Sequence, residues 1–374
     1  MTACEQLRPR DAVDVAEIIK CHPRALEPVG AGTKRAIGHP VDADVLDLSA
    51  LAGIIEYEGA ELVLTAHAAT PLRAIETALA GQGQRLAFEP PDFGRLLGGH
   101  AGQTLGGVLA ANLAGSRRVF AGAARDHFLG FRAVSGRGER FKAGGKVVKN
   151  VTGYDLPKLL AGSWGTLAVL TEVTIRVAPA PEVERTLIVP VRSAEHAVEV
   201  MTTALGSPYE ISSAAFDPKL GCLLRLEGFA SSVDARTVAL LQALGSPETA
   251  QVETGDSRAV WRDIGDAAAL AEWPIVWRIS VPPSEAPRVL TALAPERCLL
   301  DWGGGLIWAA YRELDAARVR GAVREGHATL LKAPPAVRAA TPVFHPQSST
   351  LAAVAMRVKA ALDPHDRLNP GRMG

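Results

Sequence analysis

Glycine is concentrated between residues 98 and 177, where it alternates with short apolar runs, and this stretch constrains the fold more than any other part of the chain. A glycine gives up more backbone freedom on folding than any other residue, so a dense cluster of glycines needs a structural reason. Spacing alone leaves two reasons open: close approach of the backbone to a ligand, or a set of tight turns in a β-rich domain.

Two loops in this stretch have the composition of an anion site. Residues 102–107 run into the apolar segment 108–112, and a glycine loop that opens a helix presents free N–H groups at the positive end of the helix dipole. Residues 114–118 end in Arg117 and Arg118, of which at least one could neutralise a phosphate. A solvated arginine pair is the commoner outcome for such a sequence, so both interpretations stay open.

A third glycine loop lies near the N-terminus. Residues 25–29 have the composition of a strand and lead into Gly-Ala-Gly-Thr-Lys at residues 30–34, whose successive N–H groups can form an anion-binding nest. Arg35 stands where a dinucleotide fingerprint would carry its third glycine, and the Gly-Lys-Ser/Thr ending of a P-loop is missing. The loop alone therefore does not identify its ligand.

Charge and cysteine usage exclude several classes of function. Lysine plus arginine and aspartate plus glutamate each number 40, so the formal charge is zero and a polyanion such as nucleic acid is not an expected partner. The four cysteines, Cys4, Cys21, Cys222 and Cys298, form no CxxC pair, which predicts neither a disulfide framework nor a metal site. The N-terminus has no apolar signal region, and no run of about 18 apolar residues occurs. We expect a soluble cytoplasmic protein that reaches the inner face of a membrane only through partners.

Strand-length apolar runs at residues 45–48, 53–57 and 62–67 precede a helix for which Thr70 is the expected N-cap and Pro71 the first helical residue. Alternation over residues 167–177 predicts a strand with one buried face, and an amphipathic pattern predicts a helix over 351–362.

Two proline-rich steps suggest where the chain divides. Pro-Ala-Pro at residues 179–181 is followed by alternating helical and strand patterns, which predict an α+β cap with helices on one antiparallel sheet. Ala-Pro-Pro at residues 333–335 is where we expect the chain to return to the first domain. The expected segments are therefore 1–181, 182–332 and 333–374. Five tryptophans lie in or beside the middle segment, and we assign most of them to its core or to an interface: Trp261, Trp273, Trp277, Trp302 and Trp308.

These motifs, taken together and in order, resemble a known family. The chain resembles the FAD-binding proteins of the vanillyl-alcohol oxidase and p-cresol methylhydroxylase (PCMH) superfamily, and most closely the FAD-binding subunits of glycolate oxidase complexes. The resemblance covers nearly the whole chain. It rests on residues 30–34, 89–91, 105–107, 113–118, Arg125-Asp126, Lys149-Asn150, 153–156, 162–167, 301–304 and 368–373.

The resemblance implies an α+β fold: a two-subdomain PCMH-type FAD-binding domain plus a cap. It also implies a role for each motif. Residues 30–34 would form the first pyrophosphate loop, the loops at 102–107 and 114–118 would complete the cradle, and the motif at 162–167 would line the adenine pocket. The implied cofactor-binding residues are Gly30, Ala31, Gly32, Thr33, Lys34, Pro90, Gly102, Thr104, Gly106, Gly107, Ala114, Gly115, Arg117, Arg118, Arg125, Asp126, Tyr154, Asp155, Gly162, Gly165, Leu167 and Asn369.

For two of these residues the sequence offers a plain structural alternative. Tyr154 could be a core aromatic, and Asp155 could be a helix N-cap ahead of Leu156. With the surrounding motif intact we favour proximity to the flavin for both.

Two departures from the superfamily pattern qualify the function. Covalent flavinylators often carry a histidine in the first loop, whereas this chain has Thr33 and Lys34, so we expect noncovalent FAD. The histidine-rich C-terminal motif of the glycolate-oxidising partner subunit has no counterpart here, so no catalytic residue is assigned.

The expected function is that of an FAD-bound oxidoreductase subunit that takes part in oxidising glycolate to glyoxylate, beside a second FAD subunit and an iron–sulfur subunit. Because the scattered cysteines offer no cluster ligands, the iron–sulfur centre belongs to the partner. Two alternatives stay open: a self-sufficient flavin oxidoreductase for an alcohol or 2-hydroxyacid, and a scaffold subunit that has lost FAD.

Overall fold

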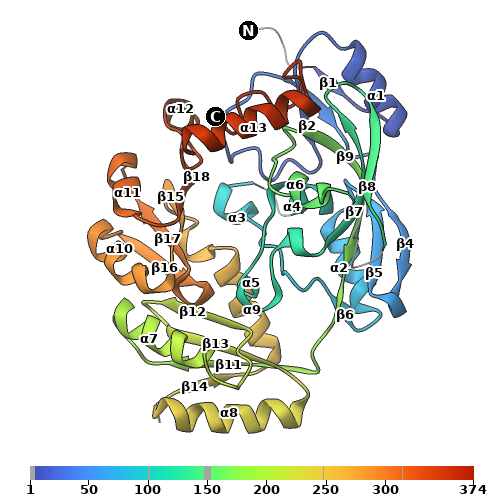
Figure 1. Cartoon of the computed structure of the whole chain (residues 1–374). Coiled ribbons are helices and arrows are strands. Elements are labelled where there is room, and N and C mark those ends of the chain that lie inside the picture. Colours follow the sequence, from blue (N-terminus) through green and yellow to red (C-terminus); the bar gives the residue numbers. More distant parts are fainter. Residues whose placement is uncertain (1–4, 100–101, 147–152, 247, 314) are drawn as a thin grey trace.

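The computed structural model describes residues 5–99, 102–146, 153–246, 248–313 and 315–374 (Figure 1). Cys4 and the Lys149-Asn150 step lie outside these ranges. Within them the strands pair into sheets of three, two, eight and five strands. The chain forms a first lobe that holds the smaller sheets and a second lobe built on the largest sheet, with the last residues returning to the first lobe (Figure 1).

The N-terminal sheet of the first lobe is parallel. It consists of β1 (Gln6–Leu7), β2 (Leu26–Val29) and β3 (Asp44–Asp47), in the order β1-β3-β2. Helix α1 (Ala12–Cys21) connects β1 to β2, as parallel strands require a crossover. Asp11 caps the helix by accepting the N–H groups of Val13 and Asp14. The predicted strand and following glycine turn at residues 25–34 are confirmed as β2 and its loop.

The second sheet of this lobe is antiparallel. Its strands are β4 (Ile54–Glu58), β5 (Val63–His67), β7 (Phe128–Ser135), β8 (Arg140–Gly144) and β9 (Ala168–Arg176), in the order β4-β5-β9-β7-β8. A short pair joins β6 (Gln84–Arg85) to β10 (Ala178–Pro179). The helices are α2 (Leu72–Ala80), α3 (Gly94–Leu97), α4 (Leu105–Ala111), α5 (Arg118–Ala121) and α6 (Leu156–Leu160). The strand expected at 167–177 is thus confirmed as β9, but the expectation of one buried face was wrong, because residues on both faces of β9 are buried.

The start of α2 differs from the sequence expectation. Pro71 is the N-cap, and the helix begins at Leu72. The Thr70 hydroxyl does not cap the helix, because it donates to the carbonyl of His67 at 2.6 Å and accepts the N–H of Gly53 at 2.9 Å. The Thr70 side chain thus makes a tertiary contact with the loop before β4 instead of the helix cap that the local sequence predicted.

The cap is one antiparallel sheet covered by helices. Its order is β14-β11-β13-β12-β16-β17-β15-β18. The strands are β11 (Val183–Val189), β12 (Ser213–Asp217), β13 (Gly221–Gly228), β14 (Ala250–Val252), β15 (Ile275–Ser280), β16 (Arg297–Asp301), β17 (Leu306–Tyr311) and β18 (His327–Lys332). The helices are α7 (Ala194–Leu205), α8 (Ala230–Leu244), α9 (Thr254–Gly265), α10 (Ala286–Leu293) and α11 (Ala316–Ala322). Four of these helices lie on the face away from the first lobe, whereas α9 lies on the side of the first lobe (Figure 1).

The C-terminal segment closes the first lobe. After α12 (Pro335–Ala340), helix α13 (Ser349–Leu362) lies beside the N-terminal sheet at the top of Figure 1. Leu368 pairs with Leu26 of β2, and the N–H of Asn369 donates to the carbonyl of Leu26 at 2.9 Å. Val354 and Met356, two of the apolar positions expected on α13, are 50% and 66% exposed. The expected division at residues 181 and 332 stays a prediction, since one apolar core contains residues of both lobes.

Candidate functional site

A cavity lies in the first lobe where several segments that are distant in sequence meet. It is lined mainly by the loop after β2, the loop after β5, helix α4, the start of β9 with the segment before it, and the C-terminal tail. Ten of the sequence-predicted cofactor residues line it: Gly30, Ala31, Gly32, Thr33, Lys34, Thr104, Gly106, Gly107, Gly165 and Asn369. The fold thus brings together the first glycine loop, part of the second, two residues of the Gly-Ser-Trp-Gly motif (Trp164 and Gly165) and the terminal asparagine.

The loop at residues 30–34 presents its backbone to this cavity. Within the described part of the chain, none of its five N–H groups has a hydrogen-bond acceptor. Gly32 has φ 72°, which glycine adopts without strain and which turns the loop back on itself. Arg372 holds the loop from behind by donating to the carbonyl of Lys34 at 2.9 Å and to Glu27 at 3.1 Å. Open successive amides are the arrangement that binds anions in a nest.

The second glycine loop works differently from the sequence expectation. The first amides of α4 are not free: the N–H of Leu105 donates to the carbonyl of Thr70 at 3.0 Å, and that of Gly106 donates to the carbonyl of Ala68 at 2.7 Å. The N–H of Gly107 donates to the Thr104 hydroxyl at 3.4 Å. The prediction of a free helix terminus here was wrong, because the loop after β5 satisfies it.

Glycine is instead required for close packing around the cavity. A Cβ on Gly30 would lie 2.5 Å from the Thr104 hydroxyl oxygen, and a Cβ on Gly106 would lie 2.7 Å from the carbonyl oxygen of Ala68. A side chain at either position would push the first loop, α4 and the β5 loop apart. Close backbone approach, rather than turn formation, therefore explains these two glycines.

Lys34 is a buried cation at the edge of the loop. Its ammonium donates to the side-chain oxygen of Gln103 at 2.8 Å, and the Gln103 amide donates to the carbonyl of Pro90 at 3.2 Å. Burial lowers the pKa of Lys34 to about 8, although the Coulomb attraction of Asp92 opposes the shift. Protein groups thus offset only part of the cost of burying the charged amine, and an anion in the loop would favour the charged form.

Asn369 has an unsatisfied acceptor at the cavity. Its amide nitrogen donates to the carbonyl of Trp164 at 2.9 Å, whereas Oδ1 is buried and has no hydrogen-bond partner among the described residues. Its backbone has φ 45°, a left-handed conformation that asparagine tolerates better than most residues. A Cβ on Gly165 would lie 3.1 Å from the Asn369 amide nitrogen, so a side chain at position 165 would press on the Asn369 amide. A buried orphan acceptor of this kind indicates a ligand donor.

Arg117 and Arg118, adjacent in sequence, point to different surroundings. Arg117 is buried, pairs with Glu227 of the cap at 3.0 Å and donates to the carbonyl of Ala87 at 3.1 Å. Arg118 lies over the ring of Trp302, 4.8 Å from its centroid. Neither is part of the solvated pair that the sequence offered as an alternative, and neither lines the cavity.

The other predicted residues lie around the cavity or away from it. Gly115, which follows Ala114, packs against the carbonyl of Glu89. Gly102 donates its N–H to Asp92, and Gly162 donates its N–H to the carbonyl of Leu109. The side chain of Leu167 is buried. Arg125 and Asp126 form a half-exposed pair at 3.7 Å. Tyr154 is 92% exposed, and Asp155 caps α6 while pairing with Lys158 at 2.8 Å. For Asp155 the structure shows the plain role of a helix cap.

Sequence reasoning missed two residues of the site. Gln103, which orients Lys34, lies inside the second glycine loop, and no local pattern predicts its contact with a residue 69 positions upstream. Arg372 follows Asn369 by three residues in the terminal motif, and a charged residue in an otherwise uncharged Leu-Asn-Pro-Gly-Arg-Met-Gly tail was the available signal.

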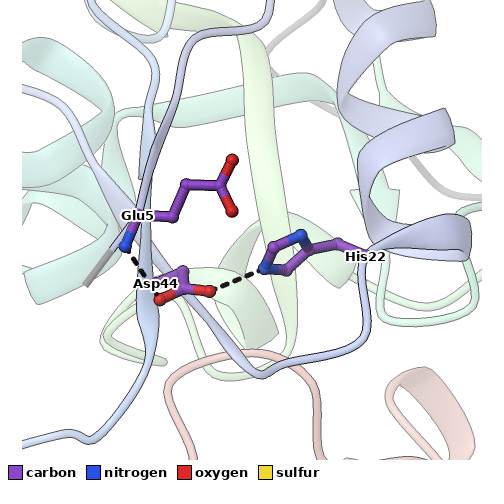
Figure 2. A group of neighbouring side chains, drawn as sticks. All are labelled: Glu5, His22 and Asp44. Carbon is purple, nitrogen blue, oxygen red and sulfur yellow. Dashed lines mark hydrogen bonds and ion pairs between the residues drawn. The ribbon is translucent and has the colours of Figure 1, made fainter. Parts of the chain in front are cut away.

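One further polar cluster lies in the N-terminal sheet. Figure 2 shows the ring of His22 directed at Asp44, with Glu5 above them. The Nε2 atom of His22 lies 2.8 Å from Oδ2 of Asp44, and the other carboxylate oxygen accepts the Glu5 N–H at 3.1 Å and the Arg24 guanidinium at 2.9 Å. These three residues have the side chains of a metal site. Because the Arg24 cation already occupies the Asp44 carboxylate, we interpret the cluster as an ion pair that joins α1 to β3.

Comparisons with known proteins place this geometry in context. Residues 6–144 match the family model described as an FAD binding domain. The chain is 37% identical over 348 residues to the glycolate oxidase subunit GlcE of Escherichia coli (strain K12), which covers 92% of this chain and 91% of that protein. It is 26% identical over 272 residues to the glycolate oxidase subunit GlcD of Bacillus subtilis (strain 168), covering 71% of this chain and 56% of that protein.

A solved structure of alkyldihydroxyacetonephosphate synthase matches over 98% of this chain and 76% of that chain, with a TM-score of 0.66 and 16% identity. At that identity the match concerns the fold alone. Together with the FAD binding domain match, it confirms the expected α+β fold of an FAD-binding domain with a cap.

Proposed function

We propose, from the premise that this chain belongs to the family of FAD-binding glycolate oxidase subunits, that it binds FAD noncovalently in the first-lobe cavity and takes part in oxidising glycolate to glyoxylate. As an FAD-linked oxidoreductase subunit it would work within a complex. When bound, FAD supplies the acceptor for the hydride or electrons, and the protein supplies binding, orientation and exclusion of water.

The observation that carries this proposal is the set of open amides at residues 30–34 beside the buried Lys34. The residues fit FAD: the open amides and the lysine would hold the pyrophosphate, and the orphan Oδ1 of Asn369 would accept an N–H of the cofactor. Thr33 and Lys34 offer no histidine for a covalent bond, which supports a noncovalent complex. The catalytic role of individual residues stays unassigned.

Partners follow from the same family. Because glycolate oxidase subunits of two kinds, GlcE and GlcD, occur among the relatives, this chain would assemble with a second FAD subunit. We further propose an iron–sulfur subunit as the electron acceptor. Among the described residues Cys21, Cys222 and Cys298 are free thiols in different parts of the structure, so the ligands of any cluster would come from that subunit. None of the described helices has the length and hydrophobicity needed to span a bilayer. We place the complex in the cytoplasm or at the inner face of the membrane, held there by partners.

The test is co-purification of the tagged chain from its native host, with absorbance spectra and mass analysis of the partners. We expect a flavin spectrum, flavin released into the supernatant by acid precipitation, and two partner subunits. A colourless protein that does not take up added FAD would refute the proposal. Flavin bleaching by glycolate in the isolated chain would instead support a self-sufficient oxidoreductase.

We expect the affinity for FAD to fall as the pH rises above about 8. Burial sets the pKa of Lys34 at about 8 against an ordinary value of 10.5, and a bound diphosphate would favour the charged amine. Binding therefore takes up a proton above pH 8, and each further pH unit lowers the affinity until the pKa of the complex is reached. Lys34→Met should bind FAD roughly tenfold more weakly with a flatter pH profile.

Fluorescence titration with FAD between pH 7 and pH 10 measures this profile. Lys146→Met is the matched control, because Lys146 is a half-exposed lysine that pairs with Glu58 at 3.3 Å and lies outside the cavity. A pH slope that is identical in Lys34→Met and in the parent would show that Lys34 does not meet the diphosphate. Without FAD the pH dependence of stability has the opposite sign: because the folded pKa of Lys34 lies below 10.5, the unfolded state binds more protons, and stability rises between pH 8 and pH 10.5.

A further inference from the structure

Two arginines from different lobes meet on one tryptophan ring outside the cavity. The guanidinium of Arg118, the first residue of α5, lies 4.8 Å from the ring centroid of Trp302. The guanidinium of Arg278, on strand β15 of the cap, lies 4.9 Å from the same centroid. Trp302 is fixed in place, since its indole N–H donates to the carbonyl of Gly115 at 3.0 Å. The ring therefore gathers two positive charges at the junction of the lobes.

Neither guanidinium forms a salt bridge with the described residues, although the Coulomb attraction of Asp301 acts on Arg278 and that of Asp126 acts on Arg118. Asp301 is the nearby acid, but one of its oxygens accepts the Ser116 hydroxyl at 2.7 Å and the other accepts the N–H of Trp302 at 2.7 Å. Burial raises the pKa of Asp301 to about 6, so near neutral pH it is still mostly ionised, but both of its oxygens are already engaged by these hydrogen bonds. The pKa of Arg278 falls to about 10 through burial and through the charge of Arg118. Both arginines are partly exposed, and two like charges beside one ring repel each other unless an anion lies near them.

The neighbouring side chains on the cap sheet are aromatic and polar. On the cap sheet Arg278 is paired with Trp308 of β17 and Thr329 of β18. His327, also on β18, has a pKa that is lowered by burial and by the charges of Arg278, His345 and Arg118, so near neutral pH it offers a neutral imidazole rather than a third cation. Aromatic walls, two cations and one neutral hydrogen-bonding ring suit an anion that also carries a hydroxyl group.

The backbone at this point is also strained. Trp302 has φ 56°, a left-handed conformation that costs roughly 1–2 kcal/mol for a residue with a side chain. Gly303 and Gly304 continue the turn with φ 67° and 100°. Strain of this kind persists where the surrounding structure requires it and is frequent at ligand sites. Here it is what presents the indole ring to both arginines.

We propose that Arg118 and Arg278 together bind the carboxylate of a small 2-hydroxy acid at the junction of the first lobe and the cap. Guanidinium groups suit this ligand because each presents paired N–H donors that match the two oxygens of a carboxylate. The choice of a hydroxy acid rests on the proposed function, whereas the carboxylate site rests on the geometry alone. This assignment gives Arg118 a role in binding the acid, in place of the FAD contact expected from the sequence.

The test is isothermal titration of the FAD-loaded protein with oxalate, a small dicarboxylate that cannot be oxidised as a hydroxy acid. We expect the parent to bind, and Arg278→Met and Arg118→Met each to weaken binding by at least about tenfold, since each loses a charge-assisted contact. Arg278→Lys should fall between, because it keeps the charge and loses the paired donors. Arg312→Met is the matched control: Arg312 lies 5.2 Å from the Trp273 ring centroid, but pairs with Glu296 at the surface.

A merely structural role for the arginines is tested by thermal unfolding of the same variants without oxalate. Removal of one of two mutually repelling charges should leave the melting temperature unchanged or raise it, whereas loss of a structural contact would lower it. Arg118→Met keeps the test available if Arg278→Met fails to fold. Oxalate affinity unchanged in both methionine variants, or inorganic phosphate bound more tightly than oxalate, would overturn the proposal.

The outcome is separable from the proposed function. FAD content is measured on every sample by absorbance. Arginine-dependent oxalate binding by a protein that takes up no FAD would refute the proposed function and support the carboxylate site. A flavin-loaded, glycolate-oxidising complex whose oxalate affinity is unchanged in both arginine variants would support the proposed function and refute the carboxylate site.

Discussion

Gly106→Ala is expected to destabilise the protein by about 3 kcal/mol and to lower its affinity for FAD at least about tenfold. The added Cβ would lie 2.7 Å from both the Cβ and the carbonyl oxygen of Ala68. That carbonyl accepts the Gly106 N–H at 2.7 Å, so the clash and the hydrogen bond involve the same atoms. Relief requires α4 to move away from the loop after β5, which opens the wall of the cavity. Denaturant unfolding and FAD titration measure the two effects.

Gly107→Ala, one residue further along α4, is the matched control for stability. Its Cβ would lie 3.1 Å from the Thr104 hydroxyl oxygen, a side-chain atom that can shift by a few tenths of an ångström. Alanine is also a better helix former than glycine by up to about 1 kcal/mol. We therefore expect this variant to unfold within about 1 kcal/mol of the parent. Equal losses in the two variants would mean that glycine is needed for helix conformation rather than for contact with Ala68.

The sequence predicted the loops of the candidate site better than their hydrogen bonds. The nest at residues 30–34 was foreseeable because it depends on local features: a strand, two glycines and a turn. The amides of α4 were predicted to be free, yet Ala68 and Thr70 accept them. Those acceptors lie more than thirty residues upstream, and only the folded chain brings them to the helix. Local composition therefore predicts where a loop forms, and tertiary contacts decide which of its donors stay available.

The same limit applies to single charged residues. Nothing in the sequence distinguishes Arg117 from Arg118, but the fold places one against Glu227 and the other on Trp302. Both partners come from the cap, more than a hundred residues later. Trp302 itself could be assigned only to a core or an interface, because its position at the junction depends on how the lobes pack. Motif order sufficed for the family and the fold, whereas side-chain roles at the junction needed the structure.

Arg225→Met is expected to cost about 3–5 kcal/mol of stability, because it leaves buried carboxylates without their cation. Arg225 is 1% exposed on β13 and donates to Glu89 of the first lobe at 2.8 Å and to Ser213 at 2.6 Å. Its guanidinium also lies 3.8 Å from Glu184, which is itself 1% exposed. Methionine fills a similar volume but carries no charge, so the loss is electrostatic rather than a cavity.

This buried network also joins the cap to the first lobe, so Arg225→Met should change the acid unfolding transition as well as the urea midpoint. Beside it, Glu227 of the cap pairs with Arg85 at 2.6 Å and Arg117 at 3.0 Å, and the nearby cations lower its pKa to about 2. Arg225 is the cation that lowers the pKa of Glu227 most, so in Arg225→Met this pKa should rise and acid unfolding should begin at higher pH. Arg10→Met is the control, because Arg10 pairs with Asp14 in solvent and its loss should not change either transition. Unchanged urea and acid midpoints in Arg225→Met would show that the packing of the apolar core alone holds the cap against the first lobe.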